Sequence, residues 1–187
     1  ASPDPADLVP TPEIQVRCRA LVRQLGSEDY EQREDAQKQL AALGRFARPA
    51  LLAGAGESDD PEIRSRCGRL LHKATELDRQ ARLNTFLADT EGRYDHDLPG
   101  WAAFRKVACS EWSFLGHTAV ADRSLRKAAR DVFADLMATP ANRELLRAAD
   151  ESKFALSEQI VARKLELYRP RNSDTPPPSV QDVAALA

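Results

Sequence analysis

Residues 12–21 read Pro-Glu-Ile-Gln-Val-Arg-Cys-Arg-Ala-Leu, and residues 61–70, 49 positions later, read Pro-Glu-Ile-Arg-Ser-Arg-Cys-Gly-Arg-Leu. Six positions match, namely the Pro, the Glu, the Ile, one Arg, the Cys and the Leu. A repeat of this size is typical of stacked helical units, each of which buries its apolar face against its neighbours. The repeat therefore predicts a helical array before any single residue is interpreted.

The first copy carries the signals of an amphipathic helix that begins at Pro12. Thr11 is a suitable N-cap, and proline is favoured in the first turn because it has no N–H to leave unpaired. Apolar residues then recur at helical spacing at Ile14, Cys18, Leu21, Val22 and Leu25. Gly26 is expected to end this helix, because glycine readily adopts the backbone conformation that follows a helix.

Similar signals predict the remaining helices, and no segment shows the alternation of a strand. These helices are expected over residues 27–43, 47–55, 61–87, 101–115, 121–137, around 140–146 and 152–168. Ser27 is the predicted N-cap of the second helix, and Tyr30 and Val132 are expected to face the core. The segment from Pro61 is either one long helix or two helices with a break near Asp78. The predicted fold class is all-α.

Two stretches carry a recognisable pattern. Residues 33–51 read Arg-Glu-x-Ala-x-x-x-Leu-x-x-Leu-Gly-x-x-Ala-x-Pro-x-Leu, and residues 60–71 read Asp-Pro-Glu-Ile-Arg-x-Arg-Cys-x-x-Leu-Leu. Residues 13–77 resemble the HEAT-like helical repeats of bacterial proteins, the two-helix units of α-solenoids. The resemblance implies helical hairpins stacked as a short right-handed solenoid. It indicates a type of fold and says little about function.

The chain is expected to have four parts. Residues 1–12 form an extended lead-in, and residues 13–88 form the HEAT-like repeats. Residues 89–168 form an irregular helical half, made either of degenerate repeats or of a cap that covers the end of the stack. Residues 169–187 form a tail with three consecutive prolines, which favour a stiff polyproline conformation.

Composition narrows the function classes. The net charge of −2 disfavours nucleic acid as a partner, because proteins that neutralise phosphates are usually basic. No run of about 18 apolar residues is present, so no membrane span is expected. The three cysteines lie far apart, which gives neither a disulfide framework nor a metal-binding spacing. The protein is expected to be either cytoplasmic or exported after cleavage before Ala1, with export slightly favoured.

Two clusters of polar residues have side chains that occur in catalytic or metal sites. Asp95, His96 and Asp97 place two carboxylates beside an imidazole, but adjacent residues rarely converge on one ion. Ser110 or Ser113 with His117 lacks the strand–turn–helix context of a nucleophile. We therefore expect no enzyme activity, no catalytic residues, no bound metal, no cofactor and no obligate small molecule.

Three residues are candidates for binding a partner. Arg17 and Arg66 occupy equivalent positions in the two copies, and the simpler interpretation is a structural ladder of paired arginines between packed helices. The alternative is a strip that binds an acidic peptide or phosphate. Trp112 is the third candidate, because tryptophan is enriched at the energetic centres of protein interfaces.

The function expected from these features is a non-catalytic helical-repeat module that binds another protein or another part of its own chain. Two alternatives follow from the resemblance. HEAT-like DNA glycosylases hold damaged duplexes, which would require a basic concave face. HEAT-like lyases attach bilin chromophores, which would require a ligand-sized pocket.

Overall fold

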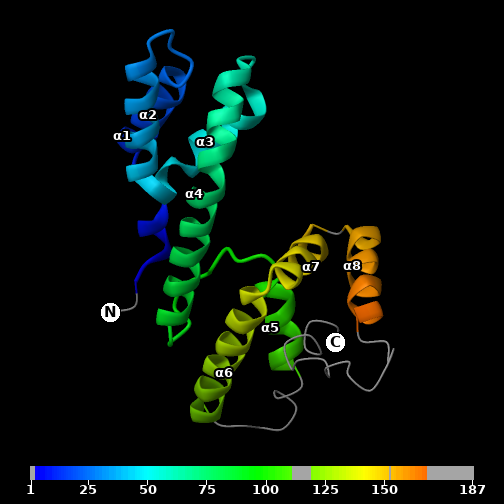
Figure 1. Cartoon of the computed structure of the whole chain (residues 1–187). Helices are drawn as coiled ribbons and strands as arrows, with labels where there is room; N and C mark the ends of the chain where they lie inside the picture. Colours follow the sequence, from blue (N-terminus) through cyan, green and yellow to red (C-terminus); the bar gives the residue numbers. More distant parts are fainter. Residues whose placement is uncertain (1–2, 111–118, 152, 168–187) are drawn as a thin grey trace. The chain divides into compact units, whose positions relative to one another are not determined.

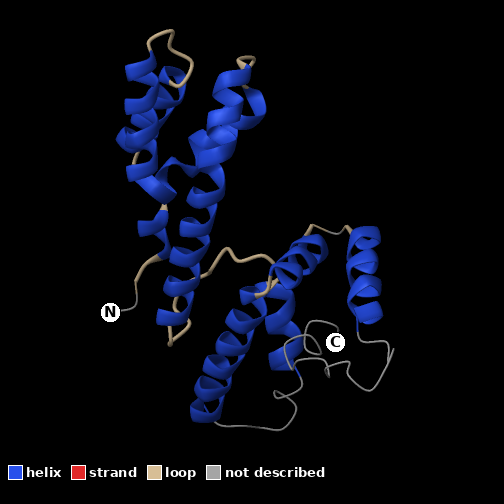
Figure 2. Ribbon diagram, in the orientation of Figure 1, coloured by secondary structure: helices blue, strands red, loops and turns tan. Residues whose placement is uncertain are grey.

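The structure is a computed structural model, and it describes residues 3–110, 119–151 and 153–167. Within these ranges the chain forms only helices and connecting loops, and no strand occurs (Figure 2). The prediction of an all-α fold is confirmed.

The described chain divides into two compact units. The N-terminal unit comprises residues 3–85, and the C-terminal unit begins at Phe86. The predicted boundary after residue 88 lies three residues later than this division. The lead-in is not extended throughout, because it contains one 3₁₀ turn, η1 (Pro5–Leu8). The predicted tail over 169–187 lies outside the described residues.

The N-terminal unit contains α1 (Pro12–Gln24), α2 (Tyr30–Leu43), the 3₁₀ turn η2 (Gly44–Ala47), α3 (Arg48–Glu57) and most of α4 (Pro61–Ala88) (Figure 1). α1 packs against both α2 and α3. α4 is a single helix of 28 residues that continues through Asp78, so the alternative of a break at that point is wrong.

Side-chain caps fix where these helices begin. Thr11 Oγ1 accepts a hydrogen bond from the Ile14 N–H at 3.4 Å, as the sequence predicts. The N-cap of α2 is Asp29 rather than Ser27, because the carboxylate of Asp29 reaches the N–H of Glu31. Either side chain can cap a helix, and the sequence alone did not distinguish between them.

One apolar core holds the N-terminal unit together. Its most buried members are Cys18, Leu25, Ala36, Leu40, Ala47, Leu51 and Cys67. Gly54 lies between α1 and α4, and a Cβ atom there would sit 2.7 Å from Cys67 Sγ and 2.8 Å from Val22 Cγ1. Tyr30 is 63% exposed, so its predicted place in the core is wrong.

The C-terminal unit contains α5 (Trp101–Ser110), α6 (Ala119–Ala138), α7 (Pro140–Asp150) and α8 (Phe154–Leu167). Consecutive helices contact one another, α5 with α6, α6 with α7, and α7 with α8. Aromatic rings of Phe86, Trp101 and Phe133 pack together in its core. Val132 is 43% exposed, so the prediction that it faces the core is also wrong.

Candidate functional site

Arg33 and Arg64 make the same pair of hydrogen bonds at the starts of α2 and α4. Nη1 of Arg33 donates to the carbonyl oxygens of Ser27 at 2.6 Å and Glu28 at 2.9 Å. Nη1 of Arg64 donates to the carbonyls six and five residues before it, at 2.7 and 2.9 Å. Each arginine therefore ties the loop that precedes its helix to the first turn of that helix.

The caps of the two helices repeat in the same register. Asp29 and Asp60 each accept the N–H two residues ahead, at 2.9 and 2.8 Å. The hydroxyls of Ser27 and Ser58 each accept the N–H of the aspartate two residues ahead, Asp29 and Asp60, at 3.2 and 3.3 Å. These hydrogen bonds recur 31 positions apart in the chain and relate α2 to α4. The 49-residue repeat relates α1 to α4, and α1 has a different cap.

The same arginine contact occurs once more in the C-terminal unit. Nη1 of Arg143, on α7, donates to the carbonyls of Met137 and Ala138, both at 2.9 Å. These carbonyls again lie six and five residues before the arginine. The pattern therefore marks the start of a helix in both units of the chain.

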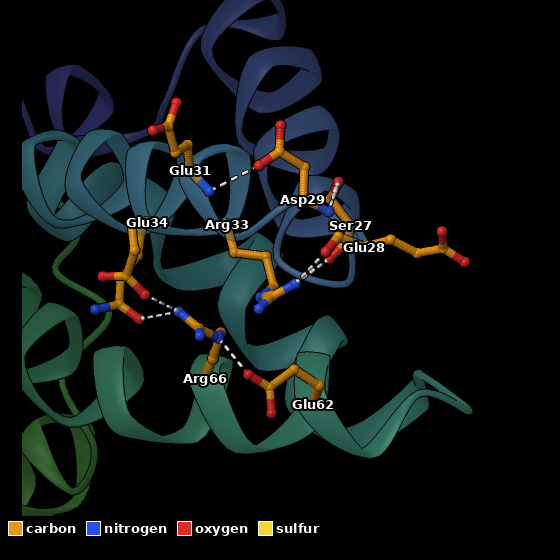
Figure 3. A network of polar contacts seen from close by, with 9 residues as sticks. Ser27, Glu28, Asp29, Glu31, Arg33, Glu34, Glu62 and Arg66 are labelled. Atoms are coloured by element: carbon orange, nitrogen blue, oxygen red, sulfur yellow. Dashed lines mark hydrogen bonds and ion pairs between the residues drawn. The ribbon is translucent and has the colours of Figure 1, made fainter.

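Arg66, a predicted partner-binding residue, is 8% exposed and is bonded to its own chain. Nη1 donates to Glu34 Oε1 at 2.7 Å and to Gln37 Oε1 at 3.0 Å, and Nε donates to Glu62 Oε1 at 2.6 Å (Figure 3). The hydrogen bond from Arg66 holds the pKa of Glu34 below its usual value of 4.5. The network joins α2 to α4, as the structural interpretation of this arginine expects.

The other two predicted residues are placed differently. Arg17 is exposed on α1, and its Nη2 donates to Oε1 of Gln39, on α2, at 2.8 Å. Arg17 and Arg66 therefore bond to different residues of the same helix. Trp112 lies outside the described residues.

An apolar hollow opens between α2 and α4, and we name it the α2–α4 hollow. Its lining comprises Leu40, Ala41, Gly44, Leu51, Leu70, Lys73, Ala74 and Leu77. Its enclosed volume is about 20 Å³. Sites for drug-sized ligands usually measure about 300–1,000 Å³, so this hollow is a shallow depression with room for roughly one water molecule.

A buried polar cluster occupies the C-terminal unit, and sequence reasoning did not find it. Asp89 is fully buried, and its carboxylate accepts the backbone N–H groups of Arg93 at 3.0 Å and Tyr94 at 3.1 Å. His96 Nε2 lies 3.0 Å from Asp89 Oδ2, and Arg130 Nη2 lies 3.5 Å from the same oxygen. Asp95 and Asp97, which the sequence disfavours as metal ligands, are exposed, whereas His96 pairs with Asp89.

This cluster orders the loop between α4 and α5. Burial acts to raise the pKa of Asp89, but hydrogen bonds from Arg93, His96 and Tyr94 and the charge of Arg130 outweigh it, so the pKa lies below its usual value of 3.8. Nη1 of Arg130 also donates to the Phe86 carbonyl at 2.6 Å. The guanidinium lies 4.6 Å from the centre of the Phe86 ring, in a cation–π contact.

Two absences hold for the residues that the structure describes. Among the described side chains, no three His, Cys, Asp or Glu residues gather in a way that could hold a metal ion. Within the same ranges, no helix combines the length and apolar character needed to cross a bilayer. The side chains of Ser110, Ser113 and His117, which the sequence does not support as a catalytic group, lie outside those described.

No family model matches this chain, and searches of curated proteins and of solved structures find no match. The resemblance to HEAT-like repeats therefore stays a prediction. We infer function from the geometry of the chain itself.

Proposed function

We propose that this protein is a non-catalytic helical-repeat interaction module that binds another protein or another part of its own chain. The observation that carries the proposal is the recurrence of one set of hydrogen bonds at Arg33 and Arg64, 31 residues apart. A repeated supersecondary unit is the building principle of solenoids, which act mainly by presenting a surface built from neighbouring units.

The contacts of the N-terminal unit support a stack of hairpins. α1 packs against α3, and Arg66 joins α4 to α2. Alternate helices are thus neighbours, as they are when two-helix units stack in two layers. We propose that these hairpins form a short right-handed solenoid of HEAT-like type.

The use of the buried charges supports the non-catalytic part of the proposal. Arg66 donates hydrogen bonds to Glu34, Gln37 and Glu62. In the C-terminal unit, Asp89 accepts hydrogen bonds from the backbone of the loop that follows α4. A catalytic acid or base must reach a substrate, whereas these groups are directed toward the protein itself. Their geometry favours a structural role.

Site-specific photo-crosslinking in native cell extract tests the proposal. A photoreactive residue replaces one exposed side chain at a time, at Val16, Leu52 and Leu77 on the N-terminal unit and at Glu91 as a control site. We expect one protein sequence to be cross-linked reproducibly from the N-terminal unit, and unlabelled chain to compete for it. The captured protein is then purified and titrated by calorimetry.

Three outcomes would contradict the proposal. The first is saturable binding to duplex DNA that weakens steeply with added salt, which would favour the glycosylase-like alternative. The second is covalent attachment of a bilin to a substrate protein, which would favour the lyase alternative. Crosslinking that unlabelled chain does not reduce would also count against specific recognition.

A further inference from the structure

Asn142, near the start of α7, is a fully buried polar side chain in the C-terminal unit. Among the described residues, neither its Oδ1 nor its Nδ2 atom has a hydrogen-bond partner. A buried polar group that gives up its hydrogen bonds to water without gaining others destabilises the arrangement that buries it. Asn142 therefore weakens the packing of α7 against the rest of its unit.

The same helix position is apolar in two other helices of the chain. α1, α4 and α7 each begin with a proline, and the third residue of these helices is Ile14, Ile63 and Asn142, respectively. Ile14 and Ile63 both pack against the core of the N-terminal unit. An apolar side chain thus suits this position, and among these three helices the buried amide is peculiar to α7.

The face of α7 that carries Asn142 also contacts the residue just before α5. Leu146 lies one turn after Asn142, so the two side chains share a face of the helix. Leu146 packs closely against Gly100, where a Cβ atom would lie 2.8 Å from Leu146 Cδ2. The amide without a partner therefore adjoins the contact between α7 and the start of α5.

Two further contacts allow α7 and α8 to move together. Leu145 and Ala148 on α7 share a small apolar core with Ile160 on α8. Nη1 of Arg143 ties the first turn of α7 to two carbonyl groups at the end of α6. The α7–α8 hairpin can therefore rotate about this tie and keep its own core intact.

We propose that the α7–α8 hairpin alternates between the packed arrangement and an open one, in which Leu146 leaves Gly100 and the amide of Asn142 forms hydrogen bonds. Opening loses apolar contact but gives both amide atoms partners. A ligand that hydrogen-bonds to this amide would bind the open arrangement and shift the population toward it. The hairpin is a conformational switch, and this inference does not depend on the proposed interaction function.

Nuclear magnetic resonance of the full chain provides the direct test. Relaxation dispersion detects minor arrangements that exchange with the major one in microseconds to milliseconds. In the wild type we expect dispersion at the backbone amides of Gly100, Asn142 and Leu146. The amide of Leu40, in the core of the N-terminal unit, should show none.

Two substitutions of Asn142 test whether the amide causes the opening. Asn142→Ile introduces the residue found at the starts of α1 and α4, and Asn142→Ala removes the amide without adding bulk. Removing the amide should lower the population of the open arrangement about tenfold or more. Asn84→Ile is the matched control, because it replaces an exposed asparagine of α4 and should leave the dispersion unchanged. Leu146→Ala should raise the open population, because it removes the contact with Gly100.

Three results would overturn the inference. Absence of dispersion at Gly100 and Leu146 would show that the hairpin has a single arrangement. Dispersion that neither Asn142→Ile nor Asn142→Ala reduces would show that the amide is not its cause. A nuclear Overhauser effect between the side-chain amide of Asn142 and a long-lived water would show that the amide is hydrogen bonded in the packed arrangement, which removes the reason to open.

Discussion

Gly44 and Thr75 occupy equivalent positions in the two 31-residue segments, and the chain turns at the first and continues at the second. Gly44 has a φ angle of +56°, and it ends α2 and starts the turn η2. Thr75 lies inside α4, which runs on to Ala88. A β-branched residue such as threonine is strongly disfavoured at a positive φ, whereas it fits inside a helix at a modest cost. Gly44 therefore permits the turn after α2, and Pro49, whose counterpart 31 residues later is Gln80, also keeps one helix from continuing through this part of the first segment.

Replacing Gly44 with alanine is expected to destabilise the N-terminal unit by about 1–3 kcal/mol, because a residue with a Cβ is strained at φ 56° and ψ −123°. The added atom would also lie 3.3 Å from Leu77 Cδ1. Gly68→Ala is the matched control. Gly68 lies inside α4 with nothing within 4 Å of its Cβ position, so alanine there should stabilise by up to about 1 kcal/mol. Urea unfolding measures the change in free energy of unfolding for each variant. Equal changes for Gly44→Ala and Gly68→Ala would contradict the explanation by backbone strain.

Gly54→Ala is expected to lower the free energy of unfolding by about 1–3 kcal/mol, because a Cβ atom there would overlap Cys67 and Val22. The same substitution is then made in a Val22→Ala, Cys67→Ala background, where the space is open. We expect its cost to disappear or to become a small gain from helix propensity. A cost that is the same in both backgrounds would show that steric overlap is not its source.

Arg66→Met is expected to lower the urea midpoint of unfolding. The decrease should be largest at neutral pH and smaller in acid. The pKa of Glu34 lies below its usual 4.5 because of Arg66. The contribution of the Glu34–Arg66 ion pair to the free energy of unfolding is therefore fully present above pH 4.5. It is lost as the pH falls through the pKa of Glu34 in the folded protein. The gap between wild type and Arg66→Met should narrow below pH 4.5.

Arg17→Met provides the control for that pH series. Arg17 is exposed and donates to the neutral amide of Gln39, so its removal should have an effect that does not change with pH. If the difference in urea midpoint between wild type and Arg66→Met stays constant as the solution is acidified, Glu34 is not the titrating partner.

Asp89→Ala is expected to destabilise the C-terminal unit by about 3–5 kcal/mol, because it removes a buried carboxylate from beside Arg130. Asp95→Ala changes an exposed residue of the same loop and should stay within about 0.5 kcal/mol of wild type. Hydrogen exchange adds a local readout, in which the amides of Arg93 and Tyr94 lose protection only in Asp89→Ala. Retained protection would show that Asp89 does not order the loop.

Cys18 and Cys67 are expected to resist alkylation in the folded protein. Both thiols are buried, and burial raises the pKa of each, which leaves little of the reactive thiolate. Iodoacetamide followed by peptide mass spectrometry should find them unmodified in buffer and fully modified in urea. Rapid modification in buffer would show that the core opens without global unfolding.

Much of the helical layout could be predicted because its signals are local. Pro12, Pro61 and Pro140 each begin a helix, since proline fits the first turn and disrupts later ones. The burial of Cys18 and Cys67 followed from their positions on an apolar stripe.

Burial at the ends and edges of helices was harder to predict. Tyr30 is the first residue of α2, and its ring lies 5.7 Å from the guanidinium of Arg33 instead of in the core. Val132 lies beside the fully buried Phe133, at the margin of the buried face of α6. Periodicity gives the direction of an apolar stripe but not its width, which depends on the neighbouring helices.

The polar clusters depend on contacts that no local pattern encodes. Arg130 lies 41 positions after Asp89, and Arg66 lies 32 positions after Glu34. In the sequence, Asp89 is one of several acidic residues in a polar loop, and no local signal marks it as buried. The 31-residue recurrence of Ser27 at Ser58 has fewer identical residues over its first ten positions than the match at 49 residues, so it is harder to recognise in the sequence.

The paired serines also bear on how such a chain can change its length. Ser27 and Ser58 open two successive segments with the same hydrogen bonds. A duplicate of residues 27–57 inserted before Ser58 would meet the same local chemistry at both junctions. Tandem duplication of this segment would therefore require no new junction sequence. The number of segments would be limited by the first and last segments of the array and not by the junctions between them.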